Sequence, residues 1–233
     1  DGIRGRDVTG VQTCALPIYW QTGKTETMVL HLEMRSRPDR DPAVPPEIGK
    51  QVVLEPMAVP SVRFYRYLYD GVGGDWTWVS RRIMDDGALA SVLSRAGAEY
   101  YLLRLDGEPA GFCELERTEG RKDVELSYFG LLPGFIGLGL GRYFINAAID
   151  LAWQPETERV WVHTCDLDHP RALGNYLRAG FVPYAREVEI LPDPRLAGLP
   201  LPPGPEERGH APDSLFRDWA AAAKLPLADD AAH

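Results

Sequence analysis

The sequence predicts a mixed α/β domain in which an antiparallel first half of the sheet is followed by a β-α-β crossover. Two strand-like runs, residues 100–105 and 110–116, are joined by Asp106-Gly107, a dipeptide that suits a tight hairpin turn because both positions tolerate a positive φ. A further strand, residues 123–132, leads into a glycine-rich loop that opens a helix. Strands and helices then alternate, which is typical of crossover connections between parallel strands.

The first residues of the chain are set apart from the rest. Residues 8–18 look like the translation of a sequencing-library adapter, and they show neither the unbroken apolar stretch of a signal peptide nor a periodic pattern. We therefore expect residues 1–18 to be a non-native leader, with the native start either before Tyr19 or at Met28.

Residues 19–60 are expected to form an N-terminal strand and a proline-rich segment that is either a connector or a cover loop. Residues 27–33 alternate enough for a strand, and six prolines between positions 38 and 60 then break regular structure. The main domain is expected at residues 61–190. Ser61 can cap its first helix, which ends at a glycine cluster, and a second helix is expected at 85–95.

The helix after the glycine-rich loop is predicted from its periodicity. Five apolar residues fall on one face over three turns, and Pro155 ends the pattern: Leu140, Phe144, Ala147, Ala148 and Leu151. A strand at 159–164, a helix at 170–179 with Gly180 just past its end, and a last strand at 181–190 follow. Residues 191–233 are expected to be a proline-rich tail with a short helix at 213–223.

Composition narrows the class of protein. No run approaches the ~18 apolar residues that a membrane-spanning helix needs, and a net charge of -9 argues against non-specific binding to nucleic acid or anionic membranes. Outside the leader only Cys113 and Cys165 remain, too few for the disulfide framework of a small secreted domain. We expect a soluble cytoplasmic protein with no nucleic-acid and no membrane partner. No pattern decides the oligomeric state, and a homodimer stays open.

The glycine-rich loop is a candidate anion site. Gly137, Gly139 and Gly141 let the backbone approach a ligand, and the first amides of the following helix point outward, where their N–H groups and the helix dipole attract phosphate. A tight turn without a ligand is the alternative. An ATPase loop would end in Gly-Lys-Ser/Thr, whereas Arg142 follows here, and a dinucleotide fingerprint would need glycine where Arg142 or Phe144 stands.

Two stretches follow the motifs of one known family. Residues 136–141 read Ile-Gly-Leu-Gly-Leu-Gly, and residues 172–181 read Ala-Leu-Gly-Asn-Tyr-Leu-Arg-Ala-Gly-Phe. They resemble the Gln/Arg-x-x-Gly-x-Gly/Ala signature and the Ala-x-x-x-Tyr-x-x-x-Gly-Phe closing motif of the GNAT superfamily of acetyl-CoA-dependent N-acetyltransferases. Ile136 departs from the first motif, and His169 stands where an asparagine is common before the second. The resemblance covers about residues 100–184.

The resemblance implies the GNAT fold and the transfer of an acetyl group from acetyl-CoA to a primary amine of a small molecule or peptide, by direct attack in a ternary complex and without a metal. Amides of the loop would hold the pyrophosphate, and the strand end would bind the pantetheine arm as though it were another strand. The implied cofactor-binding residues are Phe129, Gly130, Leu131, Ile136, Gly137, Leu138, Gly139, Leu140, Gly141 and Arg142. Gly130 in mid-strand fits a bulge.

Two residues are candidates for acid-base roles by the same resemblance. Tyr176 would protonate the departing thiolate, although a tyrosine that only anchors its helix is the alternative. Glu125 lies where some members of the family carry a catalytic glutamate, and burial could raise its pKa toward the working range. A solvated or ion-paired strand carboxylate is the alternative for Glu125.

Aromatic and polar residues are the candidates for contact with the acceptor amine. Tyr65, Trp76 and Trp78 could stack on a cationic or planar amine, with core packing as the alternative. His163 and Asp168 are candidates for the substrate pocket, and Asp168 alternatively caps a helix. The spacings of structural zinc sites are absent, so we expect no metal.

Two other functions stay open at this point. A non-catalytic acyl-CoA-binding regulatory module would bind the cofactor without turnover. A nucleotide-binding α/β protein would use the glycine loop for another phosphate, and competition by ATP or NAD would reveal it.

Overall fold

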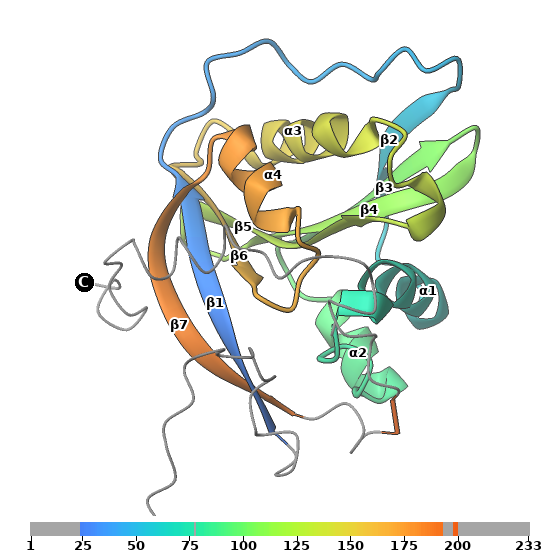
Figure 1. Ribbon diagram of the computed structural model, residues 1–233, viewed down its shortest axis with the longest axis vertical. Coiled ribbons are helices and arrows are strands. Elements are labelled where there is room, and N and C mark those ends of the chain that lie inside the picture. Colours follow the sequence, from blue (N-terminus) through green and yellow to red (C-terminus); the bar gives the residue numbers. More distant parts are fainter. Residues whose placement is uncertain (1–23, 77, 193–197, 200–233) are drawn as a thin grey trace, which may run out of the picture.

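The computed structural model describes residues 24–76, 78–192 and 198–199. Within these residues, seven strands form one sheet with the order β2-β3-β4-β5-β6-β1-β7 (Figure 1). The strands are β1 (Lys24–Met34), β2 (Val52–Met57), β3 (Ala98–Leu105), β4 (Glu108–Arg117), β5 (Asp123–Leu131), β6 (Arg159–Cys165) and β7 (Val182–Pro192). The helices are α1 (Val62–Gly73), α2 (Asp86–Leu93), α3 (Leu140–Ala152) and α4 (Ala172–Ala179), with single 3₁₀ turns at Gly74–Trp76 and Pro133–Phe135.

The predicted fold class is confirmed. Strands β2 to β5 are antiparallel neighbours, and β5 pairs in parallel with β6 after the crossover through α3. Asp106 and Gly107 form the hairpin turn between β3 and β4 with φ values of 50° and 85°, as the dipeptide predicts. The first half of the sheet is therefore a meander and the second half is built by crossovers.

The segment before residue 61 contributes more to the sheet than the sequence indicates. The expectation of an irregular connector is wrong for β2, which pairs with β3 at the edge of the sheet. Pro56 fits there because an edge strand leaves one side of its backbone without ladder hydrogen bonds. β1 lies between β6 and β7 and pairs antiparallel with both.

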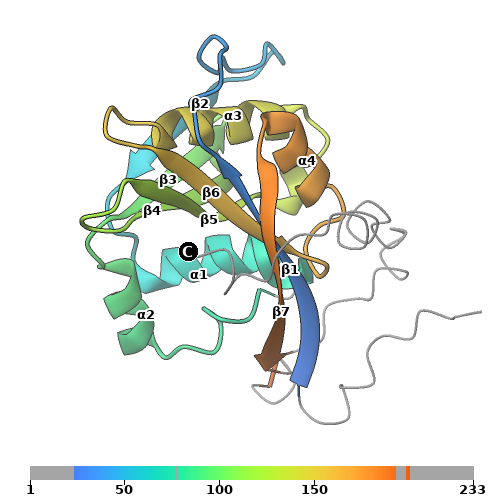
Figure 2. The same cartoon turned by 90° about the vertical axis from the view of Figure 1, so that its left-hand side faces the viewer.

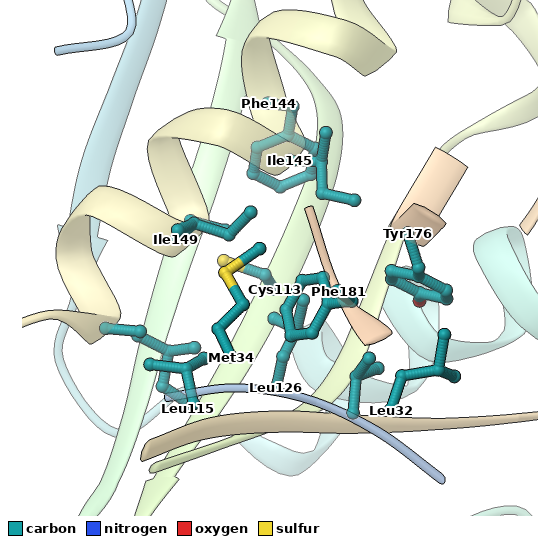
Figure 3. Packing of buried hydrophobic residues seen from close by; sticks show 14 of the residues in the cluster. Leu32, Met34, Cys113, Leu115, Leu126, Phe144, Ile145, Ile149, Tyr176 and Phe181 are labelled. Atoms are coloured by element: carbon teal, nitrogen blue, oxygen red, sulfur yellow. The ribbon is translucent and has the colours of Figure 1, made fainter. Parts of the chain in front are cut away.

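Helices cover the two faces of the sheet in pairs (Figure 2). On one face α3 buries Leu140, Phe144 and Ala148 against strand residues such as Leu115 and Leu126 (Figure 3), in agreement with the predicted periodicity. On the other face the buried side of α1 packs with strand residues of β3 and β4 in a second cluster. The two clusters lie on opposite faces of the same sheet.

Helix ends follow local chemistry. Ser61 caps α1 by accepting a hydrogen bond from the Phe64 amide at 3.3 Å, and Asp85 caps α2 in the same way from Ala88 at 2.7 Å. Gly180 ends α4 with φ 102°. None of the described helices is long and apolar enough to cross a membrane. The predicted leader at 1–18 and the predicted helix at 213–223 lie outside the described residues.

We expect Leu30→Ala to lower the free energy of unfolding by ~2–5 kcal/mol, because Leu30 is fully buried on β1 and its loss leaves a cavity in the main core. Val188→Ala on β7 is the control, since Val188 is 59% exposed and its truncation should change stability by no more than about 0.5 kcal/mol. Urea denaturation followed by circular dichroism measures both. Equal stability of the two variants would show that β1 is not integral to the core.

Candidate functional site

Strands β5 and β6 separate soon after they begin. Only Asp123–Glu125 of β5 pair with residues of β6, and the last pair joins Glu125 to Trp161. Both strands continue, β5 to Leu131 and β6 to Cys165. We call the gap between residues 126–131 and 162–165 the splay. Along it, the β5 edge presents backbone N–H and C=O groups that no strand of the described residues pairs.

A bulge accompanies the separation, though not at the predicted place. Leu126 pairs with Leu115 and Tyr128 with Glu114, so the extra residue in β5 is Ser127. Gly130, where a bulge was expected, pairs regularly with Phe112. A Cβ atom on Gly130 would overlap Cγ1 of Val72, and glycine there allows α1 to lie close to β5.

A cavity of about 940 Å³ lies against β5 at the splay, where Phe129, Gly130 and Leu131 line it. Val72, Trp76 and Trp78 line it from the side of α1, whereas α3 and α4 line it from the opposite face of the sheet. The cavity is therefore lined by elements from both faces of the sheet, beside the part of β5 that has left β6. Its volume is in the range of sites that enclose small molecules or cofactors.

The glycine-rich loop and the start of α3 form one wall of this cavity. Gly139 is the N-cap of α3 with φ 81° and offers no side-chain cap, so the first amides of the helix stay available to a ligand. Gly137 has φ 89°, and a Cβ atom at Gly137 or Gly139 would meet no other atom within 4 Å. The open space beside these backbones and the unopposed helix dipole fit an anionic group such as phosphate.

Most of the predicted cofactor-binding residues lie on the cavity wall. These are Phe129, Gly130, Leu131, Ile136, Gly137, Gly139, Gly141 and Arg142. The side chains of Leu138 and Leu140 lie elsewhere, since Leu138 is 43% exposed at the surface and Leu140 is buried in the core. Only the backbone amides of these two residues remain candidates for ligand contact.

Helix α4 places Tyr176 on the opposite wall. The side chain is largely buried, and its ring lies edge-on to Phe181 at a centroid distance of 5.9 Å (Figure 3). Burial raises the pKa of the Tyr176 hydroxyl, and the nearby charge of Asp168 adds to this effect. The phenol is therefore protonated at neutral pH, the state that a general acid needs.

Trp76, Trp78, Asp168 and His169 line one end of the cavity, which we call its mouth. Asp168 connects Trp78 to the end of β6 there. Its Oδ1 accepts a hydrogen bond from Nε1 of Trp78 at 3.3 Å, and its Oδ2 accepts from Oγ1 of Thr164 at 2.8 Å and from the amide of Cys165 at 3.1 Å. The ring of Trp76 lies 4.6 Å from that of His169, across the same mouth. The structure thus brings together Trp76, Trp78 and Asp168, three of the residues predicted for the acceptor side.

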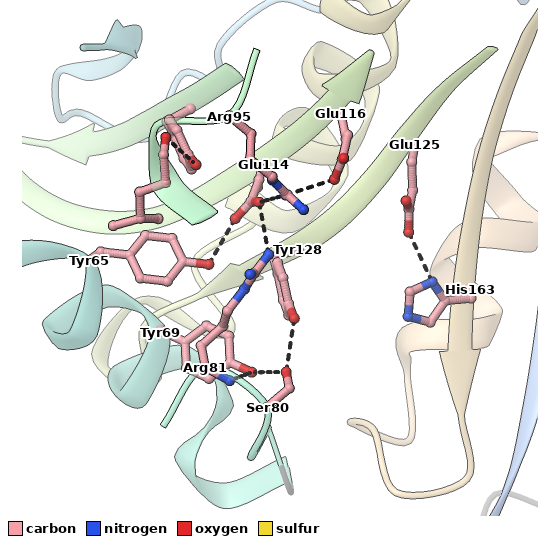
Figure 4. Close-up of polar contacts among 12 residues, drawn as sticks. Tyr65, Tyr69, Ser80, Arg81, Arg95, Glu114, Glu116, Glu125, Tyr128 and His163 are labelled. Carbon is pink, nitrogen blue, oxygen red and sulfur yellow. Dashed lines mark hydrogen bonds and ion pairs between the residues drawn. The ribbon is translucent and has the colours of Figure 1, made fainter. Parts of the chain in front are cut away.

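Tyr65 does not belong to this group, and its predicted contact with the acceptor is wrong. The side chain is 0% exposed, and its hydroxyl donates to Oε2 of Glu114 at 2.8 Å (Figure 4). Glu114 is itself fully buried, with Arg81 at 3.4 Å and Arg95 at 3.5 Å. Burial raises the pKa of Glu114, while the Tyr65 hydrogen bond and the two arginines act in the opposite direction. The helical spacing that marked Tyr65 is that of a core face.

Glu125 and His163 meet on the α1 face of the sheet, outside the cavity wall. Oε1 of Glu125 lies 3.2 Å from Nδ1 of His163 (Figure 4), and the side chains are 19% and 44% exposed. Burial lowers the pKa of His163, but the hydrogen bond and charge of Glu125, together with the charges of Asp168 and Glu189, outweigh this effect and raise it above the usual value. The structure thus pairs a predicted base with a predicted substrate residue.

The loop after β1 was expected as a connector or a cover loop, but none of its residues was predicted to belong to the site. Pro38, Asp39 and Arg40 line the cavity, and Arg40 fixes the loop to α3 by donating to Oδ2 of Asp150 at 3.1 Å and to the carbonyl of Asn146 at 3.0 Å. Partners more than a hundred residues apart leave no local pattern that could have indicated this contact. Sequence reasoning also missed polar residues that line the cavity at the N-cap of α4 and within that helix: Arg171, Asn175 and Arg178.

No group of three or more histidine, cysteine, aspartate or glutamate side chains that could hold a metal ion occurs in the part of the chain that the structure describes.

Comparison with known proteins agrees with this geometry. A model of the acetyltransferase (GNAT) family matches residues 60–181, more than half of the 233 residues. A search of curated proteins found no match.

Solved structures resemble the chain in fold. A functionally unknown conserved protein from Staphylococcus epidermidis has 19% identity and a TM-score of 0.53, over 79% of this chain and 69% of that one. A GCN5-related N-acetyltransferase from Sphaerobacter thermophilus has 14% identity and a TM-score of 0.51, over 77% of this chain and 55% of that one. A tandem GNAT protein from the clavulanic acid biosynthesis pathway has 19% identity and a TM-score of 0.51, with coverages of 74% and 55%. The chain thus spans little more than half the length of the last two proteins.

The order of the strands, the glycine-rich turn into α3 and the match over residues 60–181 lead to one assignment. This chain belongs to the GNAT acetyltransferase family.

Proposed function

We propose that the protein is an N-acetyltransferase that transfers an acetyl group from acetyl-CoA to a primary amine of a small molecule or peptide. The observation that carries the proposal is the cavity beside β5 at the splay, which has an uncapped helix start on one wall and a protonated tyrosine on another. A site lined from both faces of the sheet can hold a donor and an acceptor at once. Such a site suits direct attack in a ternary complex.

The residues present fit acetyl-CoA, which generally serves this family as donor. The amides that begin α3 are positioned for the pyrophosphate, and Gly137 and Gly139 leave room for the backbone to approach it. The β5 edge beyond the Ser127 bulge can pair with the amides of the pantetheine arm as an added strand would. When bound, acetyl-CoA supplies a thioester carbonyl for attack and a thiol leaving group. An N–H group of the β5 edge can face that carbonyl oxygen.

The side chains of the mouth and of α4 supply the remaining roles. Tyr176 is buried, protonated and on the wall, so it can give a proton to the leaving sulfur. Trp76, Trp78 and the fixed carboxylate of Asp168 form an aromatic and anionic mouth that suits an ammonium group. Glu125 and His163, beside the start of the splay, provide the acceptor of the amine proton.

We expect Gly139→Asp to weaken binding of acetyl-CoA by more than about tenfold, because its carboxylate lies at the helix start that attracts the phosphates. Gly139→Asn is the matched control, since asparagine has the same size, tolerates φ 81° about as well and adds no charge. Calorimetric titration measures both affinities. Equal affinities of the two variants would remove the start of α3 from the cofactor site.

We expect Tyr176→Phe to reduce kcat by roughly 10²-fold with little change in affinity for acetyl-CoA, since the phenol acts on the leaving thiol and not in binding. Thiol release in the presence of a panel of primary amines measures kcat, and calorimetry measures affinity. Normal turnover by the variant would assign Tyr176 a packing role. Saturable binding without thiol release by the wild type would favour a non-catalytic acyl-CoA-binding module.

A further inference from the structure

The Glu125–His163 pair stands at the point where β5 and β6 part. Glu125 and Trp161 form the last pair between the two strands, and His163 lies two residues farther along β6. The neighbouring residue Thr164 hydrogen-bonds Asp168, which lines the cavity mouth. His163 therefore lies beside the splay on the face of the sheet that α1 covers, although it does not itself line the cavity.

The contact between the two side chains determines which nitrogen of the imidazole carries the proton. A carboxylate can only accept, so Nδ1 of His163, at 3.2 Å from Oε1 of Glu125, is the protonated nitrogen. In the neutral ring Nε2 then keeps its lone pair. This is the arrangement of a general base whose orientation and tautomer are set by a carboxylate.

Other charged groups around His163 also raise the pKa of its imidazole. Asp168 follows β6 and Glu189 lies on β7, and both carboxylates favour the protonated imidazole. His31 on β1 faces it with a ring distance of 6.2 Å, but burial lowers the pKa of His31, which keeps this neighbour mostly neutral at physiological pH. The environment thus makes His163 a stronger base than a free imidazole, and its pKa lies closer to physiological pH than that of an ordinary carboxylate.

The side chains of Glu125 and His163 differ in their exposure to solvent. Only 19% of the Glu125 side chain is exposed, whereas 44% of His163 is. An amine that enters from the α1 face meets the imidazole more readily than the carboxylate beneath it.

We infer that His163 is the general base that takes the proton from the acceptor ammonium, and that Glu125 is a positioning residue that holds the imidazole. This inference rests on the proposed function. Each transfer from an ammonium substrate removes two protons from its nitrogen: one passes through Nε2 of His163 to water, and the other reaches the leaving sulfur, with Tyr176 as the donor. Each turnover therefore yields one amide, one thiol and one released proton.

The test compares the pH dependence of kcat/KM for acetyl transfer in the wild type, His163→Asn, Glu125→Gln and His31→Gln. The acceptor is the amine from a panel of simple primary amines that gives the fastest thiol release with the wild type. Asparagine keeps a donor toward Glu125 but does not titrate near neutrality. His31→Gln is the matched control, because it removes a second histidine of the same face. The ionisation of the amine itself is common to all four proteins.

The wild-type rate should rise with pH through a midpoint above 6.5, since only the neutral imidazole accepts a proton. In His163→Asn this rise of kcat/KM with pH, the ascending limb of the profile, should disappear. The value of kcat/KM should also fall by ~10²-fold or more. Glu125→Gln should keep the limb at a lower pH, because removal of the carboxylate lowers the pKa of His163. His31→Gln should keep the wild-type limb. A limb that persists in His163→Asn and disappears in Glu125→Gln would overturn the inference and make Glu125 the base.

A readout independent of turnover is the NMR titration of the His163 imidazole. It should show protonated Nδ1 in the neutral ring and a pKa that falls in Glu125→Gln. An unchanged pKa would overturn the pairing. Absence of thiol release by wild type that binds acetyl-CoA would overturn the proposed function, and the inferred role with it, whereas the titration would still report on the pair.

Discussion

The separation of β5 and β6 after three paired residues is the constraint on which the site depends. A continuous parallel pair would fill the sheet and leave no passage, whereas the bulge at Ser127 and the divergence beyond it open one and expose the β5 edge. The crossover through α3 brings its helix start to the same end of β5, and the next crossover brings Tyr176 to the facing wall. The unpaired edge of β5, the start of α3 and the side chain of Tyr176 thus surround one gap, because two successive crossovers return the chain to it.

On the opposite face, buried polar contacts position the mouth of the cavity. Glu114 is buried with Tyr65 and Arg81, and such a group is tolerated only because donors compensate its loss of water. Nearby, Oγ of Ser80 lies 3.1 Å from the hydroxyls of both Tyr69 and Tyr128, which ties the segment after α1 to β5 (Figure 4). Trp76 and Trp78 belong to that segment. The network therefore holds the aromatic side of the mouth against the strand that lines the cavity.

The segment before residue 61 also lines the cavity, on the side where α3 lies. β1 lies between β6 and β7, and the loop that leaves it crosses α3, where Arg40 meets Asp150 and the Asn146 carbonyl (Figure 1). Pro38 and Asp39 reach the cavity through this anchoring. The wall of the site is therefore assembled from the N-terminal loop, the end of α1, β5, α3 and α4, which are far apart along the chain.

The sequence by itself determined the features that depend on neighbouring residues. Asp106-Gly107 specifies its hairpin because only certain residues accept positive φ, and the apolar face of α3 follows from helical spacing. The turn before α3 likewise follows from its glycines, since Gly137 and Gly139 adopt φ values of 89° and 81°. Tertiary structure alone decided that Pro56 lies in an edge strand, that Tyr65 is buried beneath Glu114, and that Glu125 meets His163. Pairing between distant strands sets these contacts, and a side chain on a strand acquires its partner only when register and face are known.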